Sequence, residues 1–187
     1  MVLSLEKQRA VLKGFYKALF SSFGPQGWWP GRTKFEVIVG AILTQNTNWK
    51  NVEKAIKNLK ARRLLNPQAM HNVSVHELAQ LIRPAGYFNV KAIRLKHFLN
   101  HLFDNYGGRL PELFKRRTDV LREELLNING IGPETADSIL LYAANRPVFV
   151  IDAYTKRILL RHYMIKKDVD YHEIQRLFME NLAHDAE

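Results

Sequence analysis

A glycine-rich turn between two helical stretches constrains the fold of this chain more than any other feature. Residues 118–126 and 134–144 place apolar side chains at helical spacing, and Gly130-Ile131-Gly132-Pro133 lies between them. The two glycines lack a Cβ, so the backbone can adopt positive φ and a partner can approach it closely. Proline suits the first turn of a helix, where its missing N–H would have no partner anyway. The sequence therefore predicts two helices joined by a tight hairpin turn.

The hairpin turn also predicts a site for an anion. N–H groups at the start of a helix have no partners within it, and the helix dipole adds to their attraction for negative charge. The chain carries 28 Lys and Arg against 18 Asp and Glu, a net charge of +10. On such a basic chain the expected anion is a nucleic-acid phosphate. An ordinary hairpin whose glycines only permit tight packing stays open, because two glycines two residues apart are a weak signal.

Asp152 is the second feature with a chemical interpretation. It ends the apolar run from Pro147 to Ile151 and precedes a helix that periodicity predicts at 153–163. Aspartate is a favoured N-cap, so the ordinary role of Asp152 is to cap that helix. Taken alone, its position favours capping over catalysis.

Helical periodicity dominates the remaining sequence. Further helices are expected at 3–20, 34–44, 48–60, 75–82, 90–104 and 171–182. Only 147–151 resembles a strand, and it is too short and isolated to build a sheet. A chain of 187 residues forms one domain or two small lobes. We therefore predict an all-α fold with short connections.

Composition narrows the classes of protein and the compartment. The chain has no cysteine, which excludes disulfides, thiolate zinc sites and iron–sulfur clusters held by cysteine. Its seven histidines show no metal-ligand spacing. There is no signal-peptide pattern and no apolar run of membrane-spanning length. We expect a soluble, cytoplasmic protein with an anionic partner and no membrane partner.

The hairpin and Asp152 together resemble the helix-hairpin-helix DNA glycosylase superfamily, in its endonuclease III-like branch. The matching residues run from Leu126 to Ala136 and continue, at the family's spacing, with Val150-Ile151-Asp152. The resemblance implies that Gly130, Gly132 and Thr135 bind DNA, the glycines through backbone N–H groups and a phosphate. It also implies that the aspartate assists cleavage of the N-glycosidic bond of a flipped-out base, a role compatible with capping.

The same resemblance implies two helical lobes with an active-site cleft between them. One lobe is expected over 25–145 and contains the helix-hairpin-helix at about 118–144. The other combines 1–24 with 146–187 and carries Asp152 at the cleft. The chain stops at Glu187, where relatives continue, so it is either a short natural form or a truncated one.

A second set of residues is similar to the monofunctional 3-methyladenine glycosylase branch of this family. The set comprises Trp28-Trp29-Pro30, Lys34-Phe35-Glu36, the run from Gly40 to Thr47, and Trp49. The resemblance implies that Trp28, Trp29, Pro30 and Trp49 line the pocket for the extruded base. An N-alkylated purine is cationic, and aromatic faces attract a flat cation. Without the resemblance, a loop packed into the core explains the tryptophan pair, and a core position at a helix start explains Trp49.

The resemblance also assigns residues to the steps around base release. Gln45 and Tyr87 occupy positions where relatives fill the vacated base stack. Glu134, placed with the base pocket, stands where bifunctional relatives have a lysine that forms a Schiff base. A carboxylate cannot form an imine, which predicts hydrolysis without strand cleavage. Gly40 stands where adenine-mismatch relatives have a catalytic glutamate, which argues against their chemistry.

Two other functions stay open from the sequence. One is an endonuclease III-type glycosylase for oxidised pyrimidines, and the other is a non-catalytic DNA-binding module that needs only the hairpin glycines. For the glycosylase, the expected partner is double-stranded DNA with a flipped damaged base, and the expected state is a monomer. No side-chain metal site and no iron–sulfur cluster are expected. The resemblance implies only a Na⁺ or K⁺ ion on hairpin carbonyls from Leu126 to Ile131.

Overall fold

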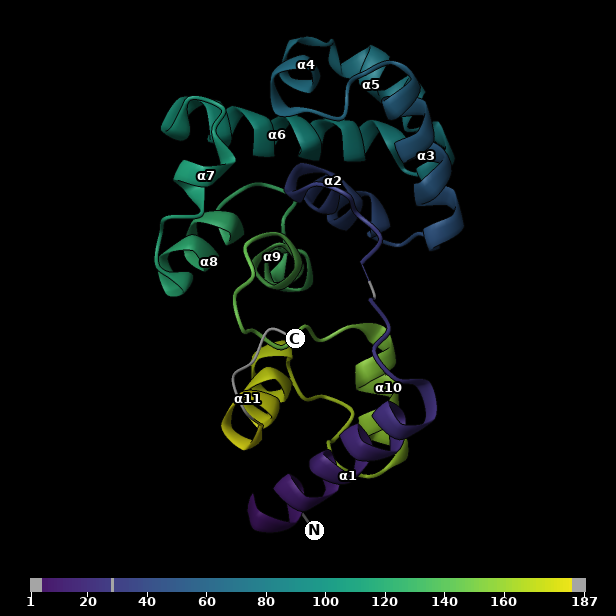
Figure 1. Cartoon of the computed structure of the whole chain (residues 1–187), viewed down its shortest axis with the longest axis vertical. Helices are drawn as coiled ribbons and strands as arrows, with labels where there is room; N and C mark the ends of the chain where they lie inside the picture. The colour runs from purple at the N-terminus through teal and green to yellow at the C-terminus, as the bar shows by residue number, and fades with distance from the viewer. Residues whose placement is uncertain (1–4, 28, 183–187) are drawn as a thin grey trace. The chain divides into compact units, whose positions relative to one another are not determined.

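The computed structural model of the chain describes residues 5–27 and 29–182, and within them every regular element is a helix (Figure 1). The prediction of an all-α fold is therefore confirmed. The chain divides into two compact units. The first combines residues 1–28 with 147–187, and the second is the continuous stretch 29–146.

The continuous unit contains most of the helices. They are α2 (Lys34–Thr44), α3 (Trp49–Ala61), α4 (Pro67–Asn72), α5 (Val75–Leu81), η1 (Arg83–Ala85), α6 (Phe88–Tyr106), α7 (Leu110–Leu113), α8 (Thr118–Leu126), α9 (Pro133–Ser138) and the π-helix η2 (Ile139–Ala143). Side chains at four N-caps, Thr33, Asn48, Asn66 and Ser74, accept a hydrogen bond from a first-turn N–H group. Local capping chemistry therefore places many of the helix starts.

Helix α2 is the centre of the continuous unit. Every residue from Phe35 to Leu43 is buried, and the helix contacts α3, α6, α9 and η2. A helix that is apolar on all sides can be stable only when other helices surround it. The one buried charge in this stretch, Glu36, is paired with Lys60 Nζ at 2.6 Å. Because α2 is held on all sides, the loops at its two ends have fixed starting points.

The two hairpin helices are joined by a buried ion pair. Arg122 of α8 donates from Nε and Nη2 to the two carboxylate oxygens of Asp137 in α9, at 2.7 and 3.0 Å. Asp137 is fully buried, and a buried carboxylate is tolerated only when it is paired and hydrogen-bonded. This bidentate contact ties α9 to α8 across the turn.

The discontinuous unit is a small bundle of three helices, α1 (Leu5–Phe23), α10 (Ala153–Arg161) and α11 (Tyr171–Asn181). The described part of its core contains a buried apolar cluster of Leu12, Ile151, Leu159, Met164, Ile174 and Phe178. Within the described residues of both units, no helix combines the length and apolar character needed to cross a membrane.

The structure corrects several expected elements. Helix α7 begins at Leu110, where periodicity predicted no helix, because Pro111 suits a helix start and Leu113 is buried. Helix α4 was not expected, since its six residues are too few to show a period. In α1, Tyr16 and Leu19 are more than half exposed, although they stand at helical spacing with the buried Leu12. Their burial could not be inferred from spacing alone.

Candidate functional site

The hairpin turn is anchored by its apolar residues and shaped by its first glycine. Ile128 and Ile131 are buried, and the N–H of Ile131 donates to the carbonyl of Ile128 at 3.0 Å. Gly130 has φ +93°, a conformation that side chains with a Cβ rarely adopt. Gly132 has an extended backbone, and a Cβ added there would meet nothing within 4 Å. The two glycines therefore have different roles: Gly130 makes the turn, and Gly132 leaves the backbone open.

Gln45 links the loop after α2 to the hairpin. Its Nε2 donates to the carbonyl of Gly130 at 3.0 Å and to Oγ1 of Thr135 at 2.9 Å. Its Oε1 accepts a hydrogen bond from Nη1 of Arg94, on α6. Thr135 is buried, so its hydroxyl lies inside this network. The structure thus brings together three residues predicted for DNA binding, Gln45, Gly130 and Thr135.

Arg94 packs directly against the hairpin turn. A Cβ on Gly130 would come within 2.3 Å of Cγ of Arg94, so only glycine fits under this side chain. The next turn of α6 brings Nδ1 of His97 to 3.0 Å from the carbonyl of Asn129. Neither contact could be predicted from the sequence, because nothing local to α6 indicates what its polar face touches.

Three aromatic rings form a cluster on α2. The rings of Trp29 and Trp49 meet edge to face, with centroids 5.6 Å apart, and Tyr142 is stacked on Trp29 at 5.0 Å and 28°. Both tryptophans are half-buried, and Nε1 of Trp49 donates to Glu53 at 2.9 Å. Trp29 and Trp49 were predicted for the base pocket, whereas Tyr142 was missed.

Gly40 lets two rings of this aromatic cluster pack closely against α2, because it has no side chain. A Cβ at Gly40 would lie 3.3 Å from the six-membered ring of Trp29 and 3.5 Å from that of Trp49. Tyr142 reaches the cluster from η2, a π-helical segment that widens the helix continuing from α9. π-Helical turns are frequent at functional sites, but the sequence carries no signal for one here.

The other residues predicted for the pocket and the DNA contact are more exposed. Pro30 and Glu134 are exposed, and Tyr87 is 74% exposed in a left-handed backbone conformation, φ +45°. Trp28 lies outside the described residues. All of these except Trp28 belong to the continuous unit, 29–146.

Asp152 belongs to the discontinuous unit, where it caps α10. Its Oδ1 accepts hydrogen bonds from the backbone N–H of Thr155 at 2.7 Å and from Oγ1 of Thr155 at 2.8 Å. The predicted capping role is confirmed. The extended segment before it is held by α11, since Tyr171 Oη accepts from Ile151 N and Gln175 Nε2 donates to the Phe149 carbonyl. Asp152 is half-buried, and the two hydrogen bonds from Thr155 orient its carboxylate.

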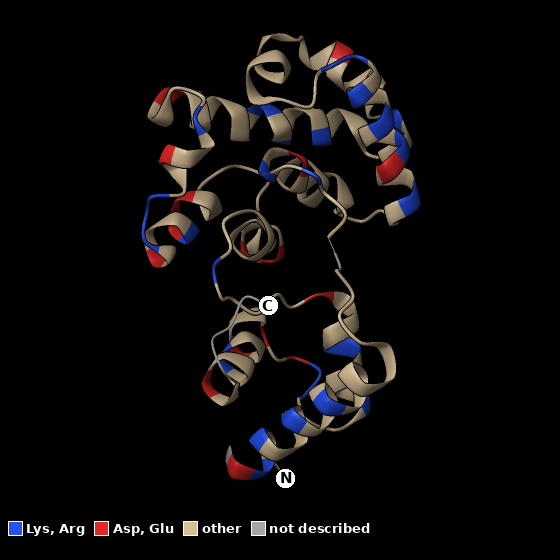
Figure 2. Cartoon of the chain, viewed as in Figure 1, with Lys and Arg blue, Asp and Glu red and all other residues tan. Residues whose placement is uncertain are grey.

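Positive charge is distributed over both units (Figure 2). Helix α3 carries Lys50, Lys54 and Lys57 at helical spacing, and all three are exposed.

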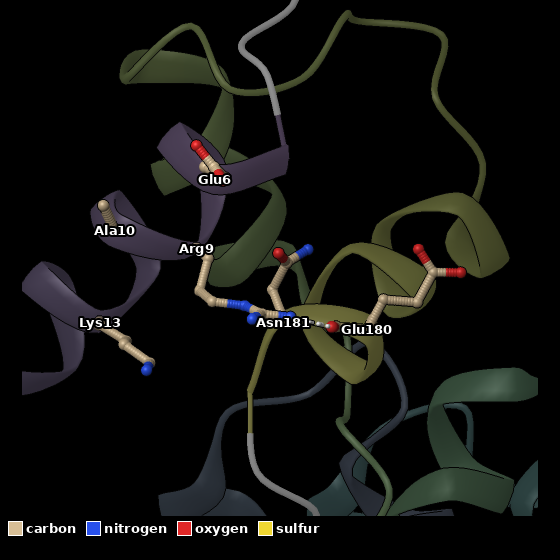
Figure 3. Close-up of a pocket in the computed structure, with 6 residues that line it drawn as sticks. All are labelled: Glu6, Arg9, Ala10, Lys13, Glu180 and Asn181. Carbon is tan, nitrogen blue, oxygen red and sulfur yellow. Dashed lines mark hydrogen bonds between the residues drawn. The ribbon is translucent and has the colours of Figure 1, made fainter.

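Within the discontinuous unit, α1 and α11 border a hollow of about 430 Å³, where Arg9 donates to the Glu180 carbonyl at 3.2 Å (Figure 3). That hollow is lined by Glu6, Arg9, Ala10, Lys13, Glu180 and Asn181, none of which was predicted as a site residue.

The all-α fold, the glycine hairpin and the capped aspartate define a class of protein. Residues 39–184 match the family of HhH-GPD superfamily base excision DNA repair proteins. The chain belongs to this family. The predicted resemblance to endonuclease III-like glycosylases is thereby confirmed.

Individual proteins with similar sequences are named as DNA repair enzymes. A provisionally named DNA repair glycosylase of Methanocaldococcus jannaschii is 50% identical over 184 residues, covering 97% of this chain and 83% of the relative. Endonuclease III of Thermotoga maritima is 32% identical, but that match covers 66% of this chain and 54% of the enzyme.

Solved structures show the same fold. The H. pylori 3-methyladenine DNA glycosylase bound to 1,N6-ethenoadenine superposes with a TM-score of 0.80 at 32% identity, over 93% of this chain and 81% of that one. A non-covalent endonuclease III–DNA complex also has a TM-score of 0.80, over 98% of this chain and 80% of that one, but at 23% identity. The second likeness concerns the fold alone.

Proposed function

We propose that this protein is a monofunctional DNA glycosylase that hydrolyses the N-glycosidic bond of alkylated purines such as 3-methyladenine in double-stranded DNA. The observation that carries the proposal is the aromatic cluster of Trp29, Trp49 and Tyr142 seated on Gly40. Flat aromatic faces attract a flat cation, and a purine alkylated on a ring nitrogen carries positive charge. The likeness to the H. pylori 3-methyladenine glycosylase supports the same substrate class.

DNA would bind through the hairpin. The open backbone at Gly132 lets a phosphate approach the first N–H groups of the helix that runs from α9 into η2. The exposed lysines of α3 add attraction for the phosphate backbone that depends on salt. Gln45 and Tyr87 would occupy the base stack after the damaged nucleotide flips out, a step that costs a few kcal/mol.

Asp152 is the proposed catalytic residue. As the bond between C1′ and the base nitrogen breaks, its electron pair leaves with the cationic base, which becomes neutral. The sugar then carries positive charge, which a nearby carboxylate stabilises. Water attacks C1′, and its proton passes to Asp152 or to solvent. Because an alkylated base is already a good leaving group, this mechanism needs no strong general acid.

Glu134 supports hydrolysis over strand cleavage. Strand cleavage by bifunctional enzymes of this family type requires an amine that forms an imine with C1′. The position that would supply it carries a carboxylate, which cannot form that bond. Glu134 is exposed beside Pro133 at the start of α9, where its negative charge also suits the positive end of the helix.

A hairpin-bound Na⁺ or K⁺ ion is also part of the proposal. Its ligands would be carbonyl oxygens between Leu126 and Ile131. Those of Asn129 and Gly130 already accept hydrogen bonds from His97 and Gln45, and each keeps a second lone pair. Such an ion would place positive charge next to the phosphate. We further propose that the protein acts as a monomer.

The test is base release from DNA methylated with dimethyl sulfate, analysed with and without alkali. We expect free 3-methyladenine, and strand breaks only after alkali treatment. Strand breaks without alkali would indicate lyase activity and contradict the role given to Glu134. In a parallel assay on DNA that contains oxidised pyrimidines, base release from that substrate alone would favour the endonuclease III-type alternative. DNA binding without base release from either substrate would favour a non-catalytic binding module.

A further inference from the structure

Lys91 is a buried cation in the middle of the continuous unit. It lies on α6 and is only 1% exposed, although lysine is rarely buried without a partner. Its Nζ donates to the carbonyls of Leu43 and Ala85, each at 2.8 Å, and to Oγ1 of Thr47 at 3.1 Å. The ammonium therefore has all three of its hydrogens engaged.

The acceptors of Lys91 belong to two different helix ends. Leu43 lies in the last turn of α2, and Ala85 is the last residue of η1. Carbonyls at helix C-termini have no partners within the helix, and a cation there is favoured by the helix dipole. Thr47 joins the same two ends, since its Oγ1 donates to the Ala85 carbonyl at 2.5 Å. One side chain of α6 thus satisfies orphan carbonyls of both elements.

Each of these helix ends leads into a short loop with strained backbone. Residues 45–48 follow α2 and contain Asn46 at φ +51°, and residues 86–87 follow η1 and contain Tyr87 at φ +45°. We call these two segments the insertion loops. Left-handed backbone at residues other than glycine persists only where the surroundings hold it in place. Lys91 and Thr47 connect the two loops, because both donate hydrogen bonds to the Ala85 carbonyl and Lys91 also donates to Thr47 and to the Leu43 carbonyl.

We propose that Lys91 is a positioning residue that holds the two insertion loops in the relative geometry needed to enter the DNA base stack at a lesion. The inference rests on the proposed function, in which Gln45 and Tyr87, one on each loop, fill the vacated stack. Without the ammonium, the buried carbonyls of Leu43 and Ala85 lose a partner, and the link between the two loops falls to the Thr47–Ala85 hydrogen bond. The loops are then held less firmly in one relative geometry, and insertion of two side chains into one gap becomes less favourable.

The chain contains a matched control for this residue. Lys96 lies on the same helix, and its Nζ also donates to three carbonyls, those of Met70, His71 and Val73 at the end of α4. Lys91→Met and Lys96→Met therefore remove the same chemistry from α6, but only Lys91→Met affects the insertion loops. A second variant, Thr47→Val, removes one tie between the loops and leaves the lysine in place.

The experiment uses the full chain and a duplex with a tetrahydrofuran abasic analogue opposite 2-aminopurine. Side chains entering the gap change 2-aminopurine fluorescence, and the change is compared at saturating protein. We expect Lys91→Met to give less than half of the wild-type change, Thr47→Val to give a smaller loss, and Lys96→Met to match the wild type. A full change with Lys91→Met, or an equal loss with Lys96→Met, would overturn the proposal.

Two further outcomes can be distinguished: a Lys91→Met variant that does not fold, and a wild-type protein that inserts into DNA but releases no base. If circular dichroism shows that Lys91→Met does not fold, Thr47→Val decides, and a wild-type fluorescence change in that variant overturns the proposal. The probe duplex has no base to release at the gap. A wild-type protein that inserts into this DNA but releases no alkylated purine would therefore refute the proposed substrate class while leaving the role of Lys91 supported.

Discussion

Asp152 and Thr155 are joined by two hydrogen bonds on a single oxygen. The backbone N–H and the hydroxyl of Thr155 both donate to Oδ1 of Asp152, at 2.7 and 2.8 Å. Among the described residues, no hydrogen bond to Oδ2 is found. The capping contact therefore orients the carboxylate while leaving its second oxygen available for a substrate or a water.

This geometry predicts that Asp152→Asn separates folding from catalysis. Asparagine caps a helix as well as aspartate does, so the free energy of unfolding should change little. Loss of the carboxylate should lower the rate of base release by about 100-fold or more, while the Kd for DNA stays close to the wild-type value. Asp170→Asn is the control, since Asp170 caps α11 in the same way. Equal rates for the Asp152→Asn and wild-type proteins would remove Asp152 from the mechanism.

Gly40→Ala should affect the aromatic cluster without lowering stability. The new Cβ would press on the ring of Trp29 at 3.3 Å, so the ring must shift by a few tenths of an ångström. Alanine is the better helix former, which offsets the steric cost. We expect base release to fall by about 3–10-fold, since displacements below 1 Å in a binding site are costly. Gly14→Ala, in α1 with nothing within 4 Å, should raise stability and leave the rate unchanged.

The two hairpin glycines should respond differently to alanine. At Gly132 a Cβ meets nothing in the protein, so Gly132→Ala should fold normally and should weaken DNA binding about tenfold, or about 1.4 kcal/mol. At Gly130, positive φ and the Arg94 side chain both oppose a Cβ, so Gly130→Ala should lower the melting temperature. Calorimetry and fluorescence anisotropy with labelled duplex measure the two effects. Unchanged affinity in Gly132→Ala would show that DNA does not approach the backbone there.

Asp137→Asn should destabilise the hairpin strongly. The substitution leaves the partly buried guanidinium of Arg122 opposite a neutral amide, and removing one partner of a buried pair costs about 3 kcal/mol. Urea denaturation measures the free energy of unfolding. Asp119→Asn on α8 is the comparison, because its pair with Arg117 is exposed and should contribute much less. Similar losses in the two variants would contradict the structural role of the Arg122–Asp137 pair.

The burial of Lys91 predicts a change in the free energy of unfolding at alkaline pH. Burial, with a smaller contribution from the positive charge of Arg94, lowers the pKa of Lys91 from 10.5 to about 8. Between these values the unfolded chain binds more protons at this site than the folded chain, so the contribution of Lys91 to the free energy of unfolding rises with pH. The gain is at most about 3 kcal/mol, because one pKa unit corresponds to about 1.4 kcal/mol.

The measurement compares wild type with Lys91→Met by urea denaturation at pH 7 and pH 10. Other groups titrate alike in both proteins, so the difference between them isolates Lys91. We expect the free energy of unfolding of the wild type, relative to that of Lys91→Met, to be larger at pH 10 than at pH 7. A difference that is the same at both pH values would show that the pKa of Lys91 is not lowered.

The sequence by itself determined the local features of this protein. Apolar spacing predicted α2 and α8 with their observed ends, and the glycine–proline turn predicted where α9 begins. The N-cap at Asp152 could also be inferred, because capping involves only a residue and the next turn of its helix. These features depend on neighbours three or four residues apart, which a sequence displays directly.

Only the tertiary structure decided which distant residues meet. Trp29 and Trp49 were expected in one pocket through family resemblance, but Tyr142 joins them because a π-helical turn in a buried helix aims its ring there. Lys91 interrupts the apolar stripe of α6, on which Leu95 and Phe98 are buried, and that interruption is a signal of a buried cation. The stripe does not reveal which carbonyls the cation binds, because these belong to segments whose approach depends on packing across the whole unit.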